Sequence, residues 1–267
     1  AARSWGAGRM TPADREALAR LLTTARREGQ QVAALPAHLV PENADEAYAV
    51  QARVAALLGW PPLGWKIAGT NDVMRARLRQ PEPILGRSFA RFLRASPAVL
   101  THAALLDPIV EAEIMLRLGR DLPPRAAPWT RAEAADAVGA AHAGIEVAEC
   151  RLPMEPLPAH TAILADGSGS GHYVIGPAIP AGTDLAALPI AVLVNGRERR
   201  TGTGAEVMGD PLLALVWLAN RRNALGDGLI AGEWISTGTC TGMLAPCAGD
   251  VVEARFGALP PVQVTFA

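Results

Sequence analysis

Cysteine is scarce in this chain. Only Cys150, Cys240 and Cys247 occur among 267 residues. A small protein held together by disulfides needs more cysteines, and a structural zinc site needs them in close pairs. The sequence therefore argues against a disulfide framework and against a cysteine-ligated zinc site, and we expect a cytoplasmic protein.

The sequence lacks an excess of one charge and any long apolar run. Its 25 basic residues nearly balance 26 acidic ones, and the net charge is −1. Nucleic acids and anionic membranes attract strongly basic surfaces, so we expect neither as a partner. No apolar run reaches the roughly 18 residues of a membrane-spanning helix. Residues 1–9 lack the apolar core of a secretory signal, and Met10 is a candidate natural start.

Lysine is almost absent. Of the 25 basic residues all but one are arginine, and the single lysine is Lys66, in the apolar segment LGWKIAGTN. Arginine keeps its proton at working pH, whereas a lysine in apolar surroundings can lose it. A leftover surface lysine is the simpler interpretation. We favour the alternative, a functional position that requires a compact or titratable ammonium group.

The N-terminal quarter predicts two helices. In MTPADREALARLLTTARREGQ, Thr11 is a suitable N-cap, Pro12 suits the first turn and Gly29 can end the helix. NADEAYAVQARVAALLGW carries an apolar stripe at helical spacing and stops at residues 59–62, Gly-Trp-Pro-Pro.

The remaining sequence has a different texture, because short apolar runs alternate with Gly and Pro. VLVNGRERR predicts a hairpin that turns at Asn195 and Gly196. EWISTGTC, DVVEARFG and VQVTFA predict strands, while DPLLALVWLANRRNALG and TRAEAADAVGAAHAG predict helices. We therefore expect an α+β protein in which a helical segment, residues 1–62, leads into a mostly β catalytic domain, residues 63–267.

Two glutamates interrupt an apolar segment. Glu111 and Glu113 stand two apart in IVEAEIMLRLG, which predicts a strand, so both side chains should point to the same face. Neighbouring buried carboxylates repel each other unless a cation compensates them, and oxygen ligands suit Mg²⁺ or Mn²⁺. Glu146 in GIEVAECRL is a candidate third ligand, with Glu149 as its competitor. The alternative is an ordinary half-exposed strand, because E-x-E is common.

Two loops rich in small residues stand next to apolar runs. Asp166–Gly171 presents backbone N–H groups and hydroxyls, a composition that can bind an anion, although a plain flexible loop is an equal alternative. Its spacing matches neither a dinucleotide fingerprint nor a P-loop. The second loop, STGTCTG, contains Thr239 and Cys240, and the cysteine is a weaker candidate for a nucleophile.

Taken together, these segments resemble the fumarylacetoacetate hydrolase superfamily, and within it the branch of 2-keto-4-pentenoate hydratases and 4-oxalocrotonate decarboxylases. GWKIAGT is similar to the branch's G-[YW]-K-I-x-x-T segment, and EAEIMLRLGRDLP to its E-x-E-I-x-x-x-L-x-R-D-L-P run. GIEVAECRL, GTGAEVMGDPLLALVWLAN and AGDVVEARFGALPPVQVTF match later blocks in the same order. The resemblance covers nearly the whole chain, and such long blocks are far more specific than a short motif.

The resemblance implies a fold and a metal site. The fold is a mixed β-sandwich roll. The ion is Mg²⁺ or Mn²⁺, held by the E-x-E pair and a later glutamate, which are Glu111, Glu113 and Glu146 here. The branch's lysine beside the substrate matches Lys66, in agreement with the interpretation from composition.

The resemblance also implies substrate contacts. The branch's D-N-x-x-S-G loop, which holds the substrate carboxylate, is similar to Asp166–Gly171 and places a hydroxyl at Ser170. We take Thr239 as a further substrate-binding candidate. The asparagine of that loop is Gly167 here, a departure that affects the substrate more than the metal.

A second departure concerns a catalytic carboxylate. Hydratases of the branch carry an acidic residue before the glycine of a P-D-F-G element, and the corresponding stretch here is EPILGRSF, with Pro83 or Ile84 at that place. Glu82 is the candidate substitute.

The expected activity is that of a metal-dependent hydratase, a lyase that adds water to a 2-hydroxy-dienoate in aromatic catabolism. One alternative is a 4-oxalocrotonate-type decarboxylase, in which Arg87 or Arg151 meets a distal carboxylate. Others are an acylpyruvate C–C hydrolase, for which no suitable histidine is evident, and a non-catalytic binding protein. We expect a small 2-oxo acid as substrate and a homo-oligomer with contacts through the C-terminal strands and the PLLALVWLAN helix.

Overall fold

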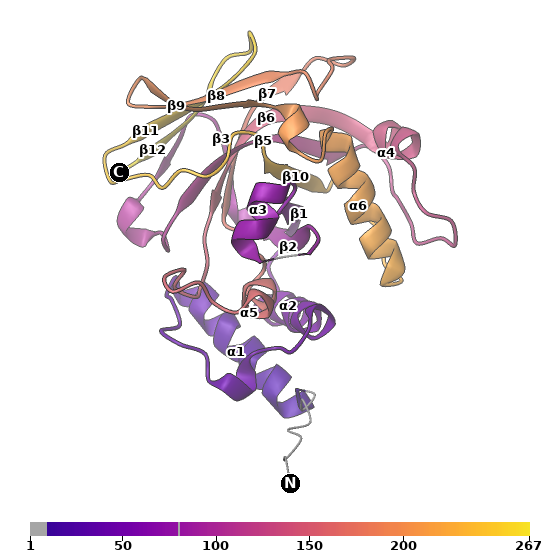
Figure 1. Cartoon of the computed structure of the whole chain (residues 1–267), viewed down its shortest axis with the longest axis vertical. Helices are drawn as coiled ribbons and strands as arrows, with labels where there is room; N and C mark the ends of the chain where they lie inside the picture. Colours follow the sequence, from indigo (N-terminus) through magenta and orange to yellow (C-terminus); the bar gives the residue numbers. More distant parts are fainter. Residues whose placement is uncertain (1–9, 80) are drawn as a thin grey trace.

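Two β-sheets share one apolar core in the computed structural model, which describes residues 10–79 and 81–267 (Figure 1). The larger sheet has the strand order β2-β1-β10-β5-β6-β7-β3, and the smaller has the order β4-β12-β11-β8-β9. Ile114 and Ile145 of the larger sheet and Val264 of the smaller are all buried in this core. A mixed α/β architecture of this kind agrees with the α+β expectation.

The strands of the larger sheet are β1 (Pro62–Ala68), β2 (Ile84–Phe89), β3 (Leu93–Ala95), β5 (Ile109–Leu118), β6 (Val138–Ala148), β7 (His172–Ile179) and β10 (Trp234–Thr239). Those of the smaller sheet are β4 (Ala98–Leu100), β8 (Pro189–Val194), β9 (Arg197–Thr203), β11 (Val251–Phe256) and β12 (Val262–Phe266). The α-helices are α1 (Pro12–Glu28), α2 (Ala44–Leu58), α3 (Asp72–Leu78), α4 (Arg131–Ala137), α5 (His160–Ala165) and α6 (Pro211–Ala224). Short 3₁₀ turns are η1 (Ala37–Leu39), η2 (Ala90–Phe92), η3 (His102–Ala104) and η4 (Gly204–Glu206).

The two N-terminal helices form as the sequence predicts. The Thr11 hydroxyl accepts a hydrogen bond from the N–H of Asp14 at the start of α1, and Gly29 ends the helix with a φ of 62°. Asn43 caps α2 in the same way, and Gly59 ends it. The apolar faces of both helices pack against β2 and α5, so the N-terminal segment covers one end of the larger sheet.

The hairpin and the long C-terminal helix are also confirmed. Strands β8 and β9 turn at Asn195 and Gly196, whose φ angles are 51° and 76°, the left-handed values of a tight hairpin turn. Helix α6 begins at Pro211 after the N-cap Asp210 and buries Leu215 and Leu218.

The helix predicted for TRAEAADAVGAAHAG is wrong in its second half. Helix α4 ends at Ala137, and strand β6 begins at the next residue and pairs with β5 on one side and β7 on the other. Close packing explains the small residues that imitate a helix. A Cβ at Gly144 would lie 2.6 Å from the Met115 sulfur, and one at Gly139 would lie 2.9 Å from the Gly119 Cα.

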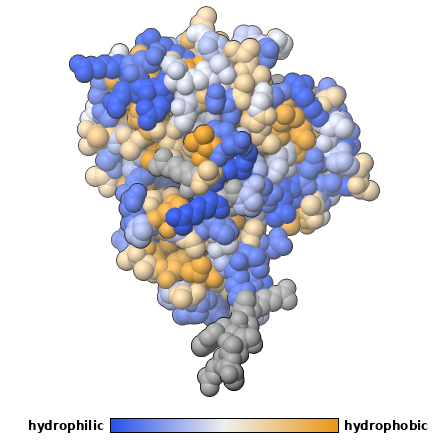
Figure 2. Space-filling model, viewed as in Figure 1, coloured by the Kyte–Doolittle hydropathy of each residue, from blue (hydrophilic) through white to orange (hydrophobic). Residues whose placement is uncertain are grey.

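The surface agrees with the balanced composition. Polar and apolar residues are interspersed over the face that Figure 2 shows. Among the described residues, no helix combines the length and the apolar character that crossing a bilayer requires.

Candidate metal centre and active-site cavity

Three buried glutamates meet where β5, β6 and β10 pair. The register places Glu111 of β5 directly opposite Glu146 of β6, and Glu113 opposite Thr239 of β10. Each glutamate offers an oxygen within 4.8 Å of the other two. The structure thus brings together the three residues that the sequence singled out as metal ligands, and it leaves their competitor Glu149 outside the group.

Lys66 of β1 faces these carboxylates. Its Nζ lies 3.2 Å from Glu146 Oε1 and 3.9 Å from Glu111 Oε2, and its side chain is only 3% exposed. Burial alone would lower the pKa of Lys66, but the three carboxylates outweigh it and raise that pKa. The sole lysine is therefore a buried counter-charge.

The charges in this cluster do not balance. Burial raises the pKa of Glu113 well above its usual range and that of Glu111 to about 7, and it raises the pKa of Glu146 against the opposing effect of Lys66. Three ionised carboxylates against one ammonium leave two negative charges, the amount that one divalent cation neutralises.

An unpartnered oxygen supports the same interpretation. Glu113 Oε2 accepts hydrogen bonds from the Ser236 hydroxyl and, at 3.0 Å, from the N–H of Gly238. Glu113 Oε1 is buried and has no hydrogen-bond partner among the described residues. Leaving such an oxygen unsatisfied is costly, and a set of carboxylate oxygens suits a hard divalent ion. The residues therefore fit a metal such as Mg²⁺ or Mn²⁺.

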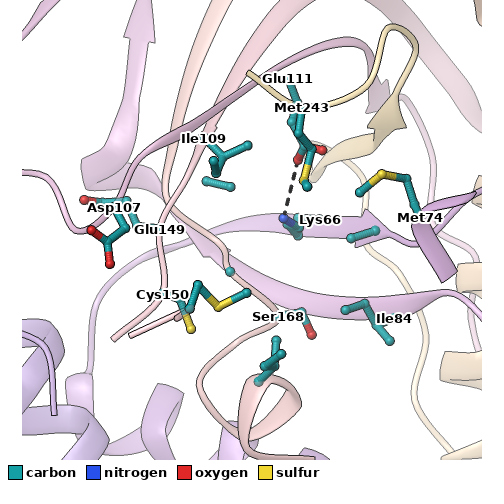
Figure 3. A pocket seen from close by; sticks show the side chains of 15 residues that line it. Lys66, Met74, Ile84, Asp107, Ile109, Glu111, Glu149, Cys150, Ser168 and Met243 are labelled. Atoms are coloured by element: carbon teal, nitrogen blue, oxygen red, sulfur yellow. Dashed lines mark ion pairs between the residues drawn. The ribbon is translucent and has the colours of Figure 1, made fainter. Parts of the chain in front are cut away.

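A small cavity of about 80 Å³ adjoins the cluster. In Figure 3, Asp107 and Glu149 lie at one end of the group of lining side chains, Met74 and Ile84 lie at the other, and Lys66 and Glu111 stand between them. Most of the remaining lining is apolar: Ala68, Met74, Ile84, Ala148, Cys150, Met154, Ile163 and Met243. A small molecule can thus meet the carboxylate cluster with one end while its other atoms contact apolar side chains.

The loop Asp166–Gly171 borders the cavity through Ser168 and Gly169. The carboxylate of Asp166 is not available to a ligand, because it pairs with Arg151, whose Nε lies 2.8 Å from Oδ1. The Ser170 hydroxyl is hydrogen-bonded to the Tyr173 hydroxyl at 2.8 Å. Both expected substrate contacts are therefore internal ones that hold the loop in place.

A glycine allows this loop to approach the sheet. A Cβ at Gly86 of β2 would lie 2.1 Å from the carbonyl oxygen of Gly167 and 3.4 Å from the Lys66 side chain. The Ser168 hydroxyl donates to the carbonyl of Leu85 at 2.6 Å. Together these contacts fix the loop next to Lys66.

Several other sequence-based expectations do not match the structure. Glu82 is exposed just before β2 and does not line the cavity, where Ile84 stands instead. The Thr239 hydroxyl donates to the Gly242 carbonyl at 2.9 Å, so it holds its own turn. Cys240 is fully buried, and burial raises the pKa of its thiol far above the usual value, which argues against a nucleophile.

The two arginines considered for a distal carboxylate also lie elsewhere. Arg87 points to the opposite side of the sheet from its neighbour Gly86, where it pairs with Glu233 at 2.8 Å and stacks on Trp65. Arg151 is bound to Asp166. Among the described residues that line the cavity, Lys66 is the only basic one.

Sequence reasoning missed the far end of the cavity. Glu149 was considered only as a metal ligand, and Asp107 was not considered. The backbone of Asp107 has a φ of 48°, an unusual value for a residue other than glycine, but this feature is visible only in the structure. In the sequence, the only hint of a role for Glu149 was its position three residues after the candidate ligand Glu146.

Two packed sheets with a buried carboxylate cluster beside a small cavity define a protein built to hold a divalent cation next to a small molecule. Residues 107–267 match the fumarylacetoacetate (FAA) hydrolase C-terminal family. The chain is 34% identical over 264 residues to a 2-keto-4-pentenoate hydratase of Paraburkholderia xenovorans (strain LB400), covering 96% of each protein. It therefore belongs to the fumarylacetoacetate hydrolase family.

Other relatives and solved structures agree with this assignment. A 2-hydroxyhexa-2,4-dienoate hydratase of Comamonas testosteroni is 27% identical over 76% of this chain and 78% of its own length. The structure of 4-oxalocrotonate decarboxylase from Pseudomonas putida G7, complexed with magnesium and adipate, superposes with a TM-score of 0.89. That match covers 97% of this chain and all of the other at 24% identity, and it shows a shared fold.

Proposed function

We propose that this protein is a divalent-metal-dependent hydratase, a lyase that adds water to a 2-hydroxy-2,4-dienoate to give a 4-hydroxy-2-oxo acid. The observation that carries the proposal is the cluster of Glu111, Glu113 and Glu146 with Lys66 beside a small, mostly apolar cavity. The names of the relatives, 2-keto-4-pentenoate hydratase and 2-hydroxyhexa-2,4-dienoate hydratase, support the same chemistry. We further propose a cytoplasmic role in the catabolism of aromatic compounds.

The head of such a substrate fits the cluster. A 2-oxo acid carries a carboxylate oxygen and a keto or enol oxygen on adjacent carbons, and a Mg²⁺ or Mn²⁺ ion held by the three glutamates would supply the Lewis acid that stabilises the enolate. Lys66 lies beside these ligands, where its ammonium can bind the head group and move a proton between the enol and keto forms.

The tail end of the cavity separates this proposal from the decarboxylase alternative. A 4-oxalocrotonate-type substrate carries a second carboxylate, which needs a cation at the distal end. Asp107 and Glu149 stand there instead, and neither Arg87 nor Arg151 reaches the cavity. Because a buried carboxylate without a cation is costly, a substrate with an uncharged tail suits this site better.

One contact favours a second candidate, hydrolysis of a C–C bond in an acylpyruvate. That reaction calls for a water activated by a His–Glu pair, and His172 Nε2 lies 3.5 Å from Oε2 of Glu149, which lines the cavity. The identity of the product distinguishes the two activities.

The test measures turnover of 2-hydroxypenta-2,4-dienoate in the presence of Mg²⁺ and in the presence of EDTA. The loss of the substrate's dienol absorbance reports the rate. We expect Mg²⁺-dependent loss with 4-hydroxy-2-oxopentanoate as product, and little turnover of 4-oxalocrotonate. An enzyme that instead cleaves an acylpyruvate to pyruvate would contradict the hydratase proposal and support the second candidate.

Three further expectations remain proposals. The packed sheets support the β-sandwich roll, with residues 63–267 as the catalytic domain after the helical segment 1–62. We also propose a homo-oligomer with contacts through α6 and the C-terminal strands, which light scattering would test.

A further inference from the structure

Glu149 is a buried carboxyl group that the metal cluster does not use. It lies just beyond the end of β6, three residues after Glu146, and its side chain is 9% exposed. It lines the cavity near Asp107, away from Lys66 (Figure 3). One oxygen, Oε1, accepts a hydrogen bond from the N–H of Leu106 at 2.8 Å. The other oxygen, Oε2, lies 3.5 Å from Nε2 of His172, and this is its only ion pair among the described residues.

The surroundings of Glu149 favour a proton on this carboxyl group. Burial raises its pKa, and the Leu106 N–H and the nearby guanidinium groups of Arg151 and Arg26 oppose that rise only in part. Arg151 is already paired with Asp166, whose own charge acts in the same direction as burial. A carboxyl with a raised pKa suits general acid–base catalysis near neutral pH.

His172 connects Glu149 to a second space. Burial and the charges of Arg94, Arg151 and Arg26 lower the pKa of His172 to about 4, so its imidazole is neutral at working pH. Glu149 and His172 both line a wider groove of about 610 Å³. Glu149 therefore borders both the small cavity and this groove, through which it can exchange protons with solvent.

The orientation of a substrate follows from the charges. Its carboxylate and enol oxygens belong beside Lys66, because Lys66 is the one basic residue among the described residues that line the cavity. The distal carbons of a 2-hydroxy-2,4-dienoate, C4 and C5, need a group that carries protons, and the side of the cavity that holds Asp107 and Glu149 offers one, whereas the side that holds Met74 and Ile84 is apolar.

We propose that Glu149 is the catalytic acid–base residue for these distal carbons; this inference rests on the proposed hydratase function. Protonated Glu149 gives its proton to C5 while the enol oxygen gives its own to solvent water, which yields the 2-oxo-3-enoate. The Glu149 carboxylate then takes a proton from a water whose oxygen bonds to C4. Electrons move to the C2 oxygen, and solvent water delivers the released proton to C3. One water is consumed, and Glu149 ends protonated as it began.

The decisive variant is Glu149→Gln, because glutamine keeps the volume and can still accept from Leu106 but cannot carry the proton. We expect kcat for hydration to fall roughly 10²- to 10³-fold. The thermal shift on adding Mg²⁺ should stay as in the unaltered enzyme. Glu149→Asp should recover part of the rate, which loss of a structural contact alone would not predict. In deuterium oxide, label incorporation at C5 should slow in parallel with hydration.

The pH profile gives a second readout. Because the first step needs protonated Glu149, kcat/KM of the unaltered enzyme should decline as pH rises through the raised pKa, and Glu149→Gln should lack that limb. The groups that face Glu149 are His172, Asp166, Asp107, Arg26 and Arg151, and all are unchanged in this variant.

Glu233→Gln is the matched control. Glu233 is also a buried carboxyl that accepts from a backbone N–H and meets a basic side chain, but it lies outside the cavity. The Glu233→Gln variant should have the same kcat as the unaltered enzyme. A Glu149→Gln enzyme that hydrates within twofold of the unaltered rate, or that loses its response to Mg²⁺, would overturn the assignment. If the unaltered enzyme shows no Mg²⁺-dependent hydration, the proposed function itself has failed.

Discussion

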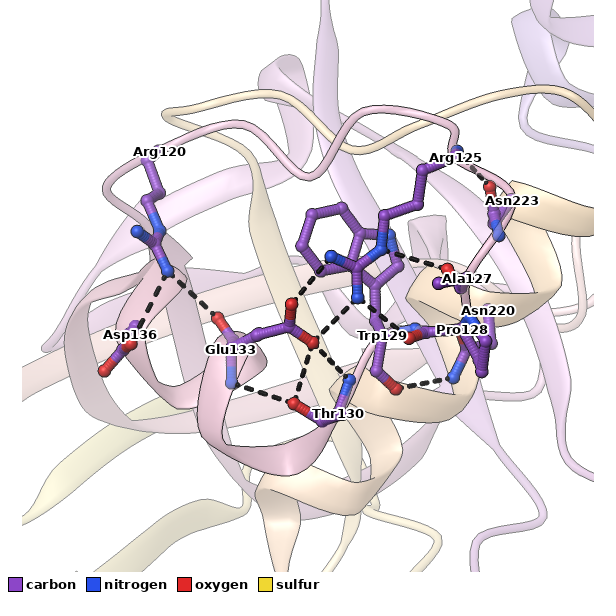
Figure 4. A network of polar contacts seen from close by, with 10 residues as sticks. All are labelled: Arg120, Arg125, Ala127, Pro128, Trp129, Thr130, Glu133, Asp136, Asn220 and Asn223. Atoms are coloured by element: carbon purple, nitrogen blue, oxygen red, sulfur yellow. Dashed lines mark hydrogen bonds and ion pairs between the residues drawn. The ribbon is translucent and has the colours of Figure 1, made fainter.

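Two polar clusters in this protein have opposite characters. At the start of α4, Arg125 forms a two-pronged pair with Glu133, at 2.6 and 2.7 Å, and lies over the Trp129 ring (Figure 4). Glu133 also completes a capping box with Thr130, and Asn220 of α6 binds both the N–H and the carbonyl of Trp129. The cluster joins the α4 segment to α6, and both oxygens of its carboxylate are satisfied.

The carboxylate cluster of Glu111, Glu113 and Glu146 is the reverse. It is buried rather than exposed, its negative charges exceed the one ammonium group, and Glu113 Oε1 has no partner among the described residues. The pKa directions express the same contrast. Hydrogen bonds from Arg125 and Thr130 lower the pKa of Glu133 to about 2, whereas burial raises that of Glu113. A polar cluster that is complete stabilises the fold, and one that is incomplete indicates a ligand.

The sharpest way to break this contrast is Glu113→Gln. We expect kcat/KM to fall roughly 10³-fold, because a Lewis acid contributes several kcal/mol to such a reaction. Without metal the variant should be more stable than the unaltered protein, since a repelled buried charge is gone, and ~1 kcal/mol would raise Tm by roughly 2–4 °C. The hydration assay measures the change in kcat/KM, and calorimetry with and without Mg²⁺ measures the change in Tm. A normal Mg²⁺ response in this variant would show that Glu113 is not a ligand.

Removing the counter-charge should have the next largest effect. Lys66→Met leaves the three carboxylates without their ammonium, and breaking a buried ion pair from one side costs about 3–5 kcal/mol. We expect the metal-free variant to lose that much stability in urea unfolding and to regain part of it with Mg²⁺, which stabilises the state that binds it. Unchanged stability of the metal-free variant would mean that Lys66 does not balance the cluster.

The smallest effect should come from the complete cluster. Glu133→Gln removes an exposed charge, so we expect a slight decrease in Tm and no change in turnover or in Mg²⁺ binding. The pKa of Glu133 is lowered by folding, so its contribution is present above the unfolded pKa and is lost as pH falls toward about 2. Acid unfolding of the two proteins should therefore converge at low pH. A loss of activity in this variant would contradict the separation of the two clusters.

Local signals carried the prediction of the helices and of the metal candidates. Thr11, Asn43, Gly29 and Gly59 act through neighbours within a few residues, so their roles can be recognised in the sequence. The E-x-E spacing fixes a common face on any strand, which is why the triad could be anticipated.

The remaining errors concern long-range partners. The Ser170 hydroxyl and the Asp166 carboxylate looked available because Tyr173 and Arg151 become their partners only in the fold. The Ala- and Gly-rich segment of β6 looked helical because the sequence does not show that β5 and β7 pack closely on both sides of it. Glu149 was weighed only as a competitor for the third metal ligand, because the sequence does not show that Leu106 and His172 become its partners.

The buried position of the only lysine has a practical consequence. Apart from the α-amino group, Lys66 is the only amine in the chain, and its Nζ faces the small cavity. An amine-selective reagent small enough to enter would therefore modify one internal site besides the α-amino group, and the mass of the intact protein would count both additions. Protection from that modification by a bound acid or metal would report occupancy of the cavity without any engineered label.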